Sequence, residues 1–183
     1  MKILILNGPN LNLQGRRDTG VYGSQTFESY FEGLKAHYPE VEVAYFQSNI
    51  EGELIDAVQQ ADGRYDGVVL NAGGYTHTSV ALRDAVSAVS VPVVEVHISS
   101  ILAREEFRHV SLLAPVAAGS IMGFGLNSSR FGVEAVLLGK RSAVLLSFRA
   151  NDSERGNPDR CRNFPAFAAD CRGIWRCLAM TSG

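Results

Sequence analysis

Hydrophobic residues along the first 139 positions gather in five short runs that are rich in β-branched side chains. Turn-forming residues bound these runs, and that pattern is typical of buried strands between turns. The runs predict strands over residues 2–6, 41–46, 91–98 and 117–124, and a further strand that begins at Val68.

Amphipathic stretches lie between these runs. In the first of them, apolar residues recur at the spacing of one helix face, and Pro39 ends the pattern. Ser48 and Glu51 have the spacing of a capping box, which predicts the start of a second helix. Thr78 or Ser79 is placed to cap a third. The helices are predicted over residues 26–38, from about residue 51, from residue 80 and over 128–138, with a short helix inside the polar crossover 99–107.

Strands that alternate with helices predict a parallel sheet covered on both faces. The expected architecture is α/β, a flavodoxin-like doubly wound sheet of five strands in the order 2-1-3-4-5. Such a sheet binds ligands in a crevice at the carboxyl ends of its strands, here outside strands 1 and 3. The crevice is therefore the place to look for functional side chains.

Three of the predicted strands end in polar groups. Asn10 follows the first strand, Asn71 and His77 follow the third, and Glu95 and His97 lie on the fourth. The carboxyl ends of parallel strands meet at one edge of a sheet, so these side chains should converge. Convergence favours a functional site over unrelated turns that only cap or pack.

Composition limits the choice of partners. The chain has 183 residues, 46% of them hydrophobic, which is enough for one real core. A net charge of −2 offers no general attraction for nucleic acid or an anionic membrane. The apolar run 3–6 is too short for a signal peptide or a membrane helix, so a cytoplasmic protein is expected. The three cysteines, at 161, 171 and 177, suggest neither disulfides nor a zinc site.

The last segment differs in charge from the rest. Residues 140–183 carry eight basic and four acidic residues, for a net charge of +4, whereas residues 1–139 carry −6. We therefore expect a catalytic domain over 1–139 and an atypical, irregular basic extension over 140–183. The run 143–148 could add a sixth edge strand. A neutral extension is the favoured interpretation of the segment, and a basic interaction segment is the alternative.

Glu95 and His97 are candidates for acid–base chemistry. Residues two apart on a strand share a face, so the carboxylate can orient the imidazole and support its protonated form. A protonated imidazole is a general acid. A buried structural ion pair is the alternative. Two histidines and one glutamate in separate segments lack the spacing of a metal site, so no metal is expected.

Arg17 and Tyr22 share a long glycine-containing loop, 11–23. A tyrosine with the ordinary pKa of about 10 is a poor base near neutrality. A nearby arginine in a closed site would favour the phenolate and so lower that pKa. Surface residues on the rim of the site are the alternative interpretation.

Several motifs of the chain resemble those of the type II 3-dehydroquinate dehydratases. The opening Asn7-Gly8-Pro9-Asn10-Leu11-Asn12 is one, and the run Asn71-Ala72-Gly73-Gly74-Tyr75-Thr76-His77-Thr78-Ser79 is another. The similar segments are residues 3–13, 15–17, 21–23, 46–49, 51–55, 71–84, 92–99, 103–109 and 123–125. They cover residues 2–139 in order, and the 140–183 segment has no counterpart.

The resemblance implies a reaction. Members of this family remove water from 3-dehydroquinate reversibly, giving 3-dehydroshikimate through an enolate, without a cofactor or a metal. By resemblance, Tyr22 as phenolate removes the C2 proton and His97 protonates the departing hydroxyl. Arg17 would keep the tyrosine ionised, Asn10 would position groups near the enolate, and Glu95 is assigned to the catalytic set with His97.

The resemblance also implies how the substrate is held. Asp84 is expected to act across a subunit interface, because the family assembles trimers into a homododecamer. Residue 18 is an aspartate and residue 19 a threonine, where the family often has Glu-Pro, so lid stiffness should differ. The other implied substrate-binding residues are Asn71, Gly73, His77, Ile98, Ser99 and Arg108.

Two questions stay open at this point. The reaction serves both chorismate biosynthesis and quinate breakdown. A non-enzymatic binding module on the same scaffold, such as a flavin or quinate sensor, is the alternative function. The presence of Arg17, Tyr22 and His97 together favours the enzyme.

Overall fold

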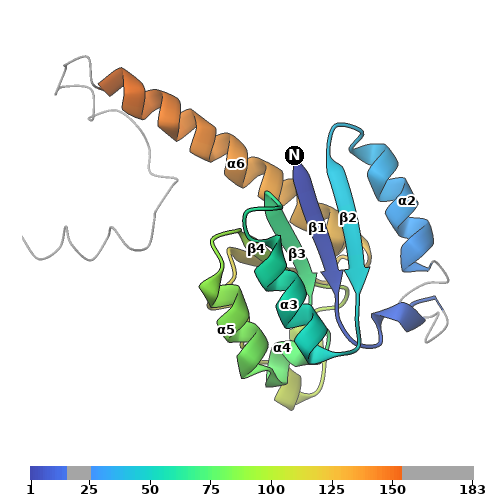
Figure 1. Cartoon of the computed structure of the whole chain (residues 1–183). Helices are drawn as coiled ribbons and strands as arrows, with labels where there is room; N and C mark the ends of the chain where they lie inside the picture. The colour runs from blue at the N-terminus through green and yellow to red at the C-terminus, as the bar shows by residue number, and fades with distance from the viewer. Residues whose placement is uncertain (16–25, 154–183) are drawn as a thin grey trace, which may run out of the picture. The chain divides into compact units, whose positions relative to one another are not determined.

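The computed structural model describes the backbone of residues 1–15 and 26–153 (Figure 1). Its centre is a five-stranded sheet in the order β2-β1-β3-β4-β5, in which every neighbouring pair is parallel. The strand order and the parallel pairing confirm the sequence prediction. The strands are β1 (Lys2–Asn7), β2 (Glu42–Gln47), β3 (Gly67–Asn71), β4 (Val93–His97) and β5 (Gly119–Met122).

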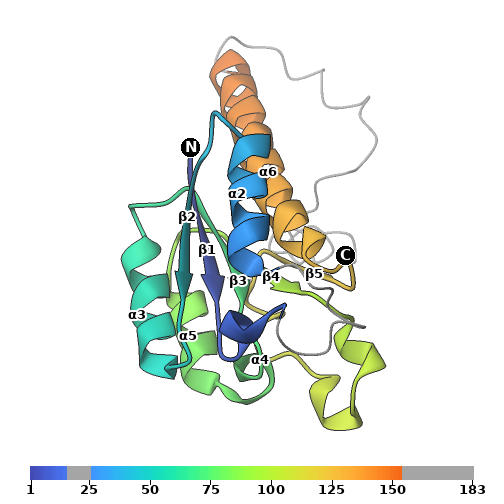
Figure 2. The ribbon, with the colours of Figure 1, turned by 90° about the vertical axis from the view of Figure 1, so that its right-hand side faces the viewer.

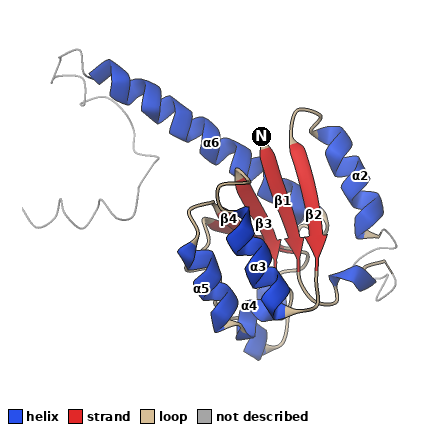
Figure 3. Cartoon of the chain, viewed as in Figure 1, coloured by secondary structure: helices blue, strands red, loops and turns tan. Residues whose placement is uncertain are grey.

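Helices connect the strands (Figure 3). Thr26 caps α2 by accepting the Ser29 N–H at 3.3 Å, and Ser79 caps α5 by accepting the Leu82 N–H at 2.8 Å. The Ser79 cap was one of the two predicted. The helices are α2 (Phe27–His37), α3 (Glu51–Ala61), α4 (Tyr75–Thr78), α5 (Val80–Ala88) and α6 (Asn127–Ser153), with short 3₁₀ turns η1 (Leu11–Leu13), η2 (Ile101–Ala103) and η3 (Glu106–Arg108).

Alternate residues of the strands fill two separate cores, one on each face of the sheet. On one face, β1, β3 and β4 pack against α3 and α5; on the other, they pack against α2 and the first turns of α6 (Figure 2). In β1, Leu4 and Leu6 belong to the first core, and Ile3 and Ile5 belong to the second. Burial on both faces explains why these strands read as continuous apolar runs.

The predicted capping box at the start of α3 is wrong. The N-cap is Ile50, which has no side chain that can accept a hydrogen bond. Ser48 lies two residues earlier, so its hydroxyl accepts the Ile50 N–H at 2.9 Å and donates to the Glu53 carboxylate. Glu53 rather than Glu51 is the residue three positions into the helix, where a carboxylate reaches back to the start.

The last described helix also differs from expectation. α6 continues to Ser153, so the strand suggested for residues 143–148 is wrong. A short apolar run does not distinguish a strand from a helix by periodicity alone, and here the helix simply continues. The chain divides into two compact units, Met1–Ser142 and Ala143–Gly183. The extension beyond Ser153 lies outside the described residues. None of the described helices is long and apolar enough to cross a membrane.

Candidate active site

A cleft of about 940 Å³ opens at the carboxyl ends of the strands. Asn10 lies after β1, Asn71 ends β3, and Ile98 follows β4, so the cleft lies where the topology predicts a ligand. Predicted site residues that line it are Asn10, Asn71, Gly73, Ile98, Ser99 and Arg108. The structure thus gathers residues from four separate segments around one cavity.

Two glycines let the loops after β1 and β3 approach each other. Gly8 donates its N–H to the Asn71 carbonyl at 2.7 Å, and a Cβ at Gly8 would lie 2.6 Å from the Ala72 carbonyl oxygen. Gly73 has a φ of +58°, and a Cβ there would lie 3.0 Å from the Pro9 carbonyl oxygen. Side chains at these positions would separate the loops.

The loop after β1 is fixed from the side by a set of residues that we call the rim network: Asn10, Gln47, Asn49 and Tyr75. Asn10 has a left-handed backbone, with φ of 68°, and donates its N–H to Asn49 Oδ1 at 2.9 Å. Gln47 Nε2 donates to the same oxygen at 3.1 Å, and the Tyr75 hydroxyl donates to the Asn49 carbonyl at 3.1 Å. No role was predicted for Asn49 from the sequence.

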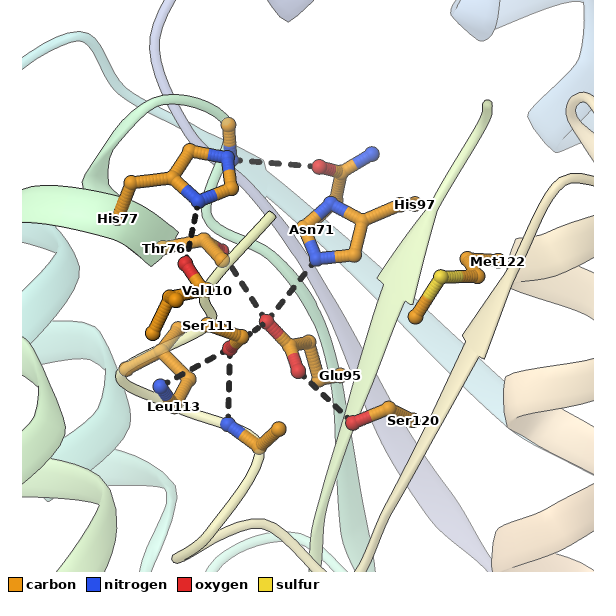
Figure 4. Close-up of polar contacts among 12 residues, drawn as sticks. Asn71, Thr76, His77, Glu95, His97, Val110, Ser111, Leu113, Ser120 and Met122 are labelled. Atoms are coloured by element: carbon orange, nitrogen blue, oxygen red, sulfur yellow. Dashed lines mark hydrogen bonds and ion pairs between the residues drawn. The ribbon is translucent and has the colours of Figure 1, made fainter. Parts of the chain in front are cut away.

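A second set of residues, the floor network, includes the end of β4, which runs directly into the cleft residue Ile98. Its members are Glu95, His97, Thr76, Ser111 and Ser120 (Figure 4). Glu95 and His97 are each 1% exposed, and His97 Nε2 lies 2.9 Å from Glu95 Oε1. The same carboxylate oxygen accepts hydrogen bonds from Thr76 at 3.2 Å and Ser111 at 2.7 Å. Ser120 donates to the other oxygen at 2.8 Å. The predicted Glu95–His97 contact is present.

The floor network keeps Glu95 ionised. Burial alone would raise the pKa of the Glu95 carboxyl, but hydrogen bonds from His97, Ser111 and Ser120 outweigh it, and the pKa lies below its ordinary value. An ionised carboxylate accepts the Nε2 proton of His97, which fixes the orientation of the ring. The second ring nitrogen, Nδ1, faces away from Glu95, on the side of Asn71 (Figure 4).

His77 lies beside His97. The two rings are stacked with their centroids 6.5 Å apart and an angle of 15° between their planes. His77 Nδ1 lies 2.7 Å from the Val110 carbonyl oxygen, so Nδ1 carries a proton and donates it. His77 Nε2 is buried and has no partner among the described residues. Nε2 is therefore the ring nitrogen of His77 that is left for a contact beyond these residues.

The crossover after β4 supplies two arginines to the cleft. Arg104 donates to the Ser99 hydroxyl from Nε at 3.1 Å and from Nη2 at 2.7 Å, which fixes that side chain. Arg108 Nε lies 3.1 Å from Glu105 Oε2, although its angle does not satisfy a hydrogen bond. This contact is a weak surface ion pair, so the guanidinium of Arg108 remains able to bind an anion.

Six predicted residues do not line the described cleft: His77, Glu95 and His97 lie next to it in the networks given above, and the other three are Asp84, Arg17 and Tyr22. Asp84 is on α5, its side chain is 67% exposed, and it pairs with Arg83 at 3.5 Å. Arg17 and Tyr22 lie outside the described residues. Gln14, for which no role was predicted, lines the cleft at 8% exposure, and its amide has no partner within the described part of the chain. The described residues contain no group of three acidic, histidine or cysteine side chains that could hold a metal.

An ionised carboxylate that orients a histidine at the cleft of a flavodoxin-like sheet is typical of an acid–base enzyme. The family model "Dehydroquinase class II" matches residues 1–137. The chain therefore belongs to the class II dehydroquinase family, a family of hydro-lyases. This confirms the resemblance seen in the motifs.

Individual relatives of the chain support the same family assignment. The chain is 50% identical over 141 residues to a 3-dehydroquinate dehydratase of Campylobacter jejuni, covering 76% of this chain and 86% of the relative. It is 54% identical over 138 residues to one from Synechocystis, covering 74% and 91%. The crystal structure of type II dehydroquinase from Butyrivibrio crossotus matches with a TM-score of 0.71 and 43% identity, over 74% of this chain and 97% of that one.

Proposed function

We propose that this protein dehydrates 3-dehydroquinate to 3-dehydroshikimate through an enolate, as a step of the shikimate pathway or of quinate breakdown. The observation that carries the proposal is the buried Glu95–His97 pair at the end of β4, beside the cleft. The family and the relatives named 3-dehydroquinate dehydratase support the same activity. They favour an enzyme over a non-enzymatic binding module.

The reaction requires a base and an acid. The base removes the proton from C2, next to the ketone, and the electron pair enters the enolate. The C1 hydroxyl then leaves as water with a proton from His97. The base afterwards releases the C2 proton to the solvent and His97 takes one proton back from it, so both groups return to their starting states. No electrons are gained or lost overall, so the scheme needs no redox cofactor.

His97 is the acid in this scheme. Glu95 accepts the hydrogen bond from His97 Nε2, so His97 delivers the catalytic proton from Nδ1, on the opposite side of the ring. The negative charge of Glu95 stabilises the imidazolium before it donates. Glu95 is thus a positioning residue that acts through His97.

The base in this scheme is Tyr22, activated by Arg17. Both residues lie outside the described part of the chain, so their roles rest on the motifs that contain them. Lowering a tyrosine pKa by ~3 units needs roughly 4 kcal/mol of preferential stabilisation of the phenolate. An arginine in a closed site is the group suited to provide it.

Residues in the cleft and next to it hold the substrate. His77 Nε2 accepts a hydrogen bond from a substrate hydroxyl, because its other nitrogen is committed to Val110. Arg108 attracts the negative charge of the substrate. We assign the remaining substrate contacts to Asn71, Gly73, Ile98 and Ser99, all of which line the cleft. Asn10 also lines it, and its proposed role is to position groups near the enolate.

We also propose a homododecamer built from trimers, with Asp84 acting across an interface, and a cytoplasmic location. Large apolar side chains on the surface of the crossover support self-association: Leu102 is 66% exposed, Phe107 71% and Val110 66%. Light scattering would test the assembly, since a monomer at micromolar concentration would contradict it. Cell fractionation would test the location.

The direct test of activity follows the ultraviolet absorbance of the product. Full-length protein is mixed with 3-dehydroquinate after chelation, and again after borohydride treatment. We expect turnover to survive both treatments, because neither a metal nor a Schiff base takes part. Folded protein that gives no absorbance rise would refute the proposed function.

A further inference from the structure

α4 is a single helical turn whose first three side chains are each tied to a different part of the site. Tyr75 donates to the Asn49 carbonyl, Thr76 donates to Glu95, and His77 donates to the Val110 carbonyl. A four-residue helix has little stability of its own. These external contacts therefore determine where His77 lies.

Asn49 also contacts the other side of the cleft. Its Oδ1 atom accepts the Asn10 N–H at 2.9 Å, while its own carbonyl accepts the Tyr75 hydroxyl. Among the described residues, Asn49 is thus the one that forms hydrogen bonds with both Asn10 and the α4 turn. It lies just beyond β2, whose last residue, Gln47, donates to the same Oδ1 atom.

The backbone of Asn10 needs such support. It is the only described residue other than glycine with a positive φ, 68°. Asparagine tolerates the left-handed region better than most residues, but the conformation is still uncommon. The bond to Asn49 fixes the Asn10 N–H, and with it the direction of a side chain that lines the cleft.

We propose that Asn49 is a positioning residue of the active site, which holds Asn10 through its side-chain oxygen and the His77-bearing turn through its carbonyl. The inference rests on the proposed dehydratase activity. Asn49 is exposed, so its role is geometric and does not depend on burial. Because the side chain and the carbonyl serve different loops, their effects can be separated.

Three variants separate them. Asn49→Ala removes the bonds to Asn10 and Gln47 but keeps the carbonyl. Asn49→Asp retains an oxygen that accepts both bonds. Tyr75→Phe removes only the bond from the α4 turn. Gln60→Ala, at an exposed position of α3, is the matched control.

The variants are expected to change different kinetic constants. Asn49→Ala should lower kcat about tenfold, equivalent to ~1.4 kcal/mol, because Asn10 serves the chemical step. Asn49→Asp should restore kcat to within about threefold of wild type, since it keeps the acceptor. Tyr75→Phe should instead raise KM several-fold with little change in kcat, because the α4 turn carries the substrate-binding His77. Gln60→Ala should match wild type, and all melting temperatures should stay close together.

Two results would overturn the inference. One is wild-type kcat in Asn49→Ala, measured alongside active wild-type enzyme. The other is a kcat in Asn49→Asp as low as in Asn49→Ala, which would show that the acceptor oxygen is not what matters. Wild-type protein without turnover is a separate outcome: it would refute the dehydratase activity, and this inference with it.

Discussion

The floor network and the rim network both fix side chains of the cleft, but in different surroundings. The floor network is built on Glu95 and His97, which are almost completely buried, and all its donors converge on one carboxylate. The rim network is built on exposed Asn49, where water competes for every bond. A buried network should therefore couple catalysis to stability, and an exposed one should affect geometry alone.

The largest effect is expected from Glu95→Ala. His97 and three hydroxyl groups would lose their shared acceptor, and His97 and Thr76 are too deeply buried for water to replace it. Breaking a buried pair costs about 3–5 kcal/mol of unfolding free energy. Urea denaturation at pH 7 measures the loss. A loss below ~1 kcal/mol would show that the floor network is not structural.

The two serines of the floor network should differ in how much unfolding free energy is lost when each is replaced by alanine. Ser111 Oγ donates to Glu95 and also accepts the N–H groups of Leu113 and Ala114. Ser120 donates to Glu95 only and is exposed, so water can replace it. We expect Ser111→Ala to cost roughly 2–3 kcal/mol and Ser120→Ala about 1 kcal/mol. Equal losses, measured by denaturation under the same conditions, would contradict the distinction.

Acid should weaken the floor network. The pKa of Glu95 is lowered on folding from its ordinary value of 4.5, by the hydrogen bonds that outweigh burial. Its contribution to stability is therefore complete above about pH 4.5 and is lost as the pH falls through the lower folded-state pKa. Thermal unfolding between pH 7 and 3 should show a steeper acid decline in wild type than in Glu95→Gln. Parallel curves would argue against a lowered pKa.

The smallest loss of stability is expected at the rim. Asn49→Ala and Tyr75→Phe each remove exposed hydrogen bonds, so each should lower the unfolding free energy by less than about 1 kcal/mol. Denaturation of both variants beside Ser111→Ala makes the comparison direct. A rim variant that loses as much stability as Ser111→Ala would remove the contrast between the two networks.

Much of the fold could be predicted from local pattern. Strands buried on both faces gave unbroken apolar runs. The alternation with helices predicted a parallel sheet, for which the flavodoxin-like strand order was the expected one. The Glu95–His97 contact followed from a spacing of two on a strand. The two errors, the α3 cap and the 143–148 run, both arose where a short pattern fits more than one local structure.

The partners of these site residues could not be predicted. Thr76, Ser111 and Ser120 meet Glu95 from three separate segments, and nothing in an isolated serine or threonine indicates that destination. The role of Asn49 depends on the left-handed backbone of Asn10 and on the position of Tyr75. These are consequences of tertiary packing, which hydrophobic periodicity does not encode.

The central claim is that His97 acts as the acid after another group has formed the enolate. The most direct test incubates His97→Gln with 3-dehydroquinate in D₂O and follows C2 by NMR. The account predicts that deuterium still enters C2, because the base is intact, while formation of 3-dehydroshikimate falls at least ~100-fold. Loss of both exchange and dehydration, or unchanged dehydration, would contradict the assignment of His97.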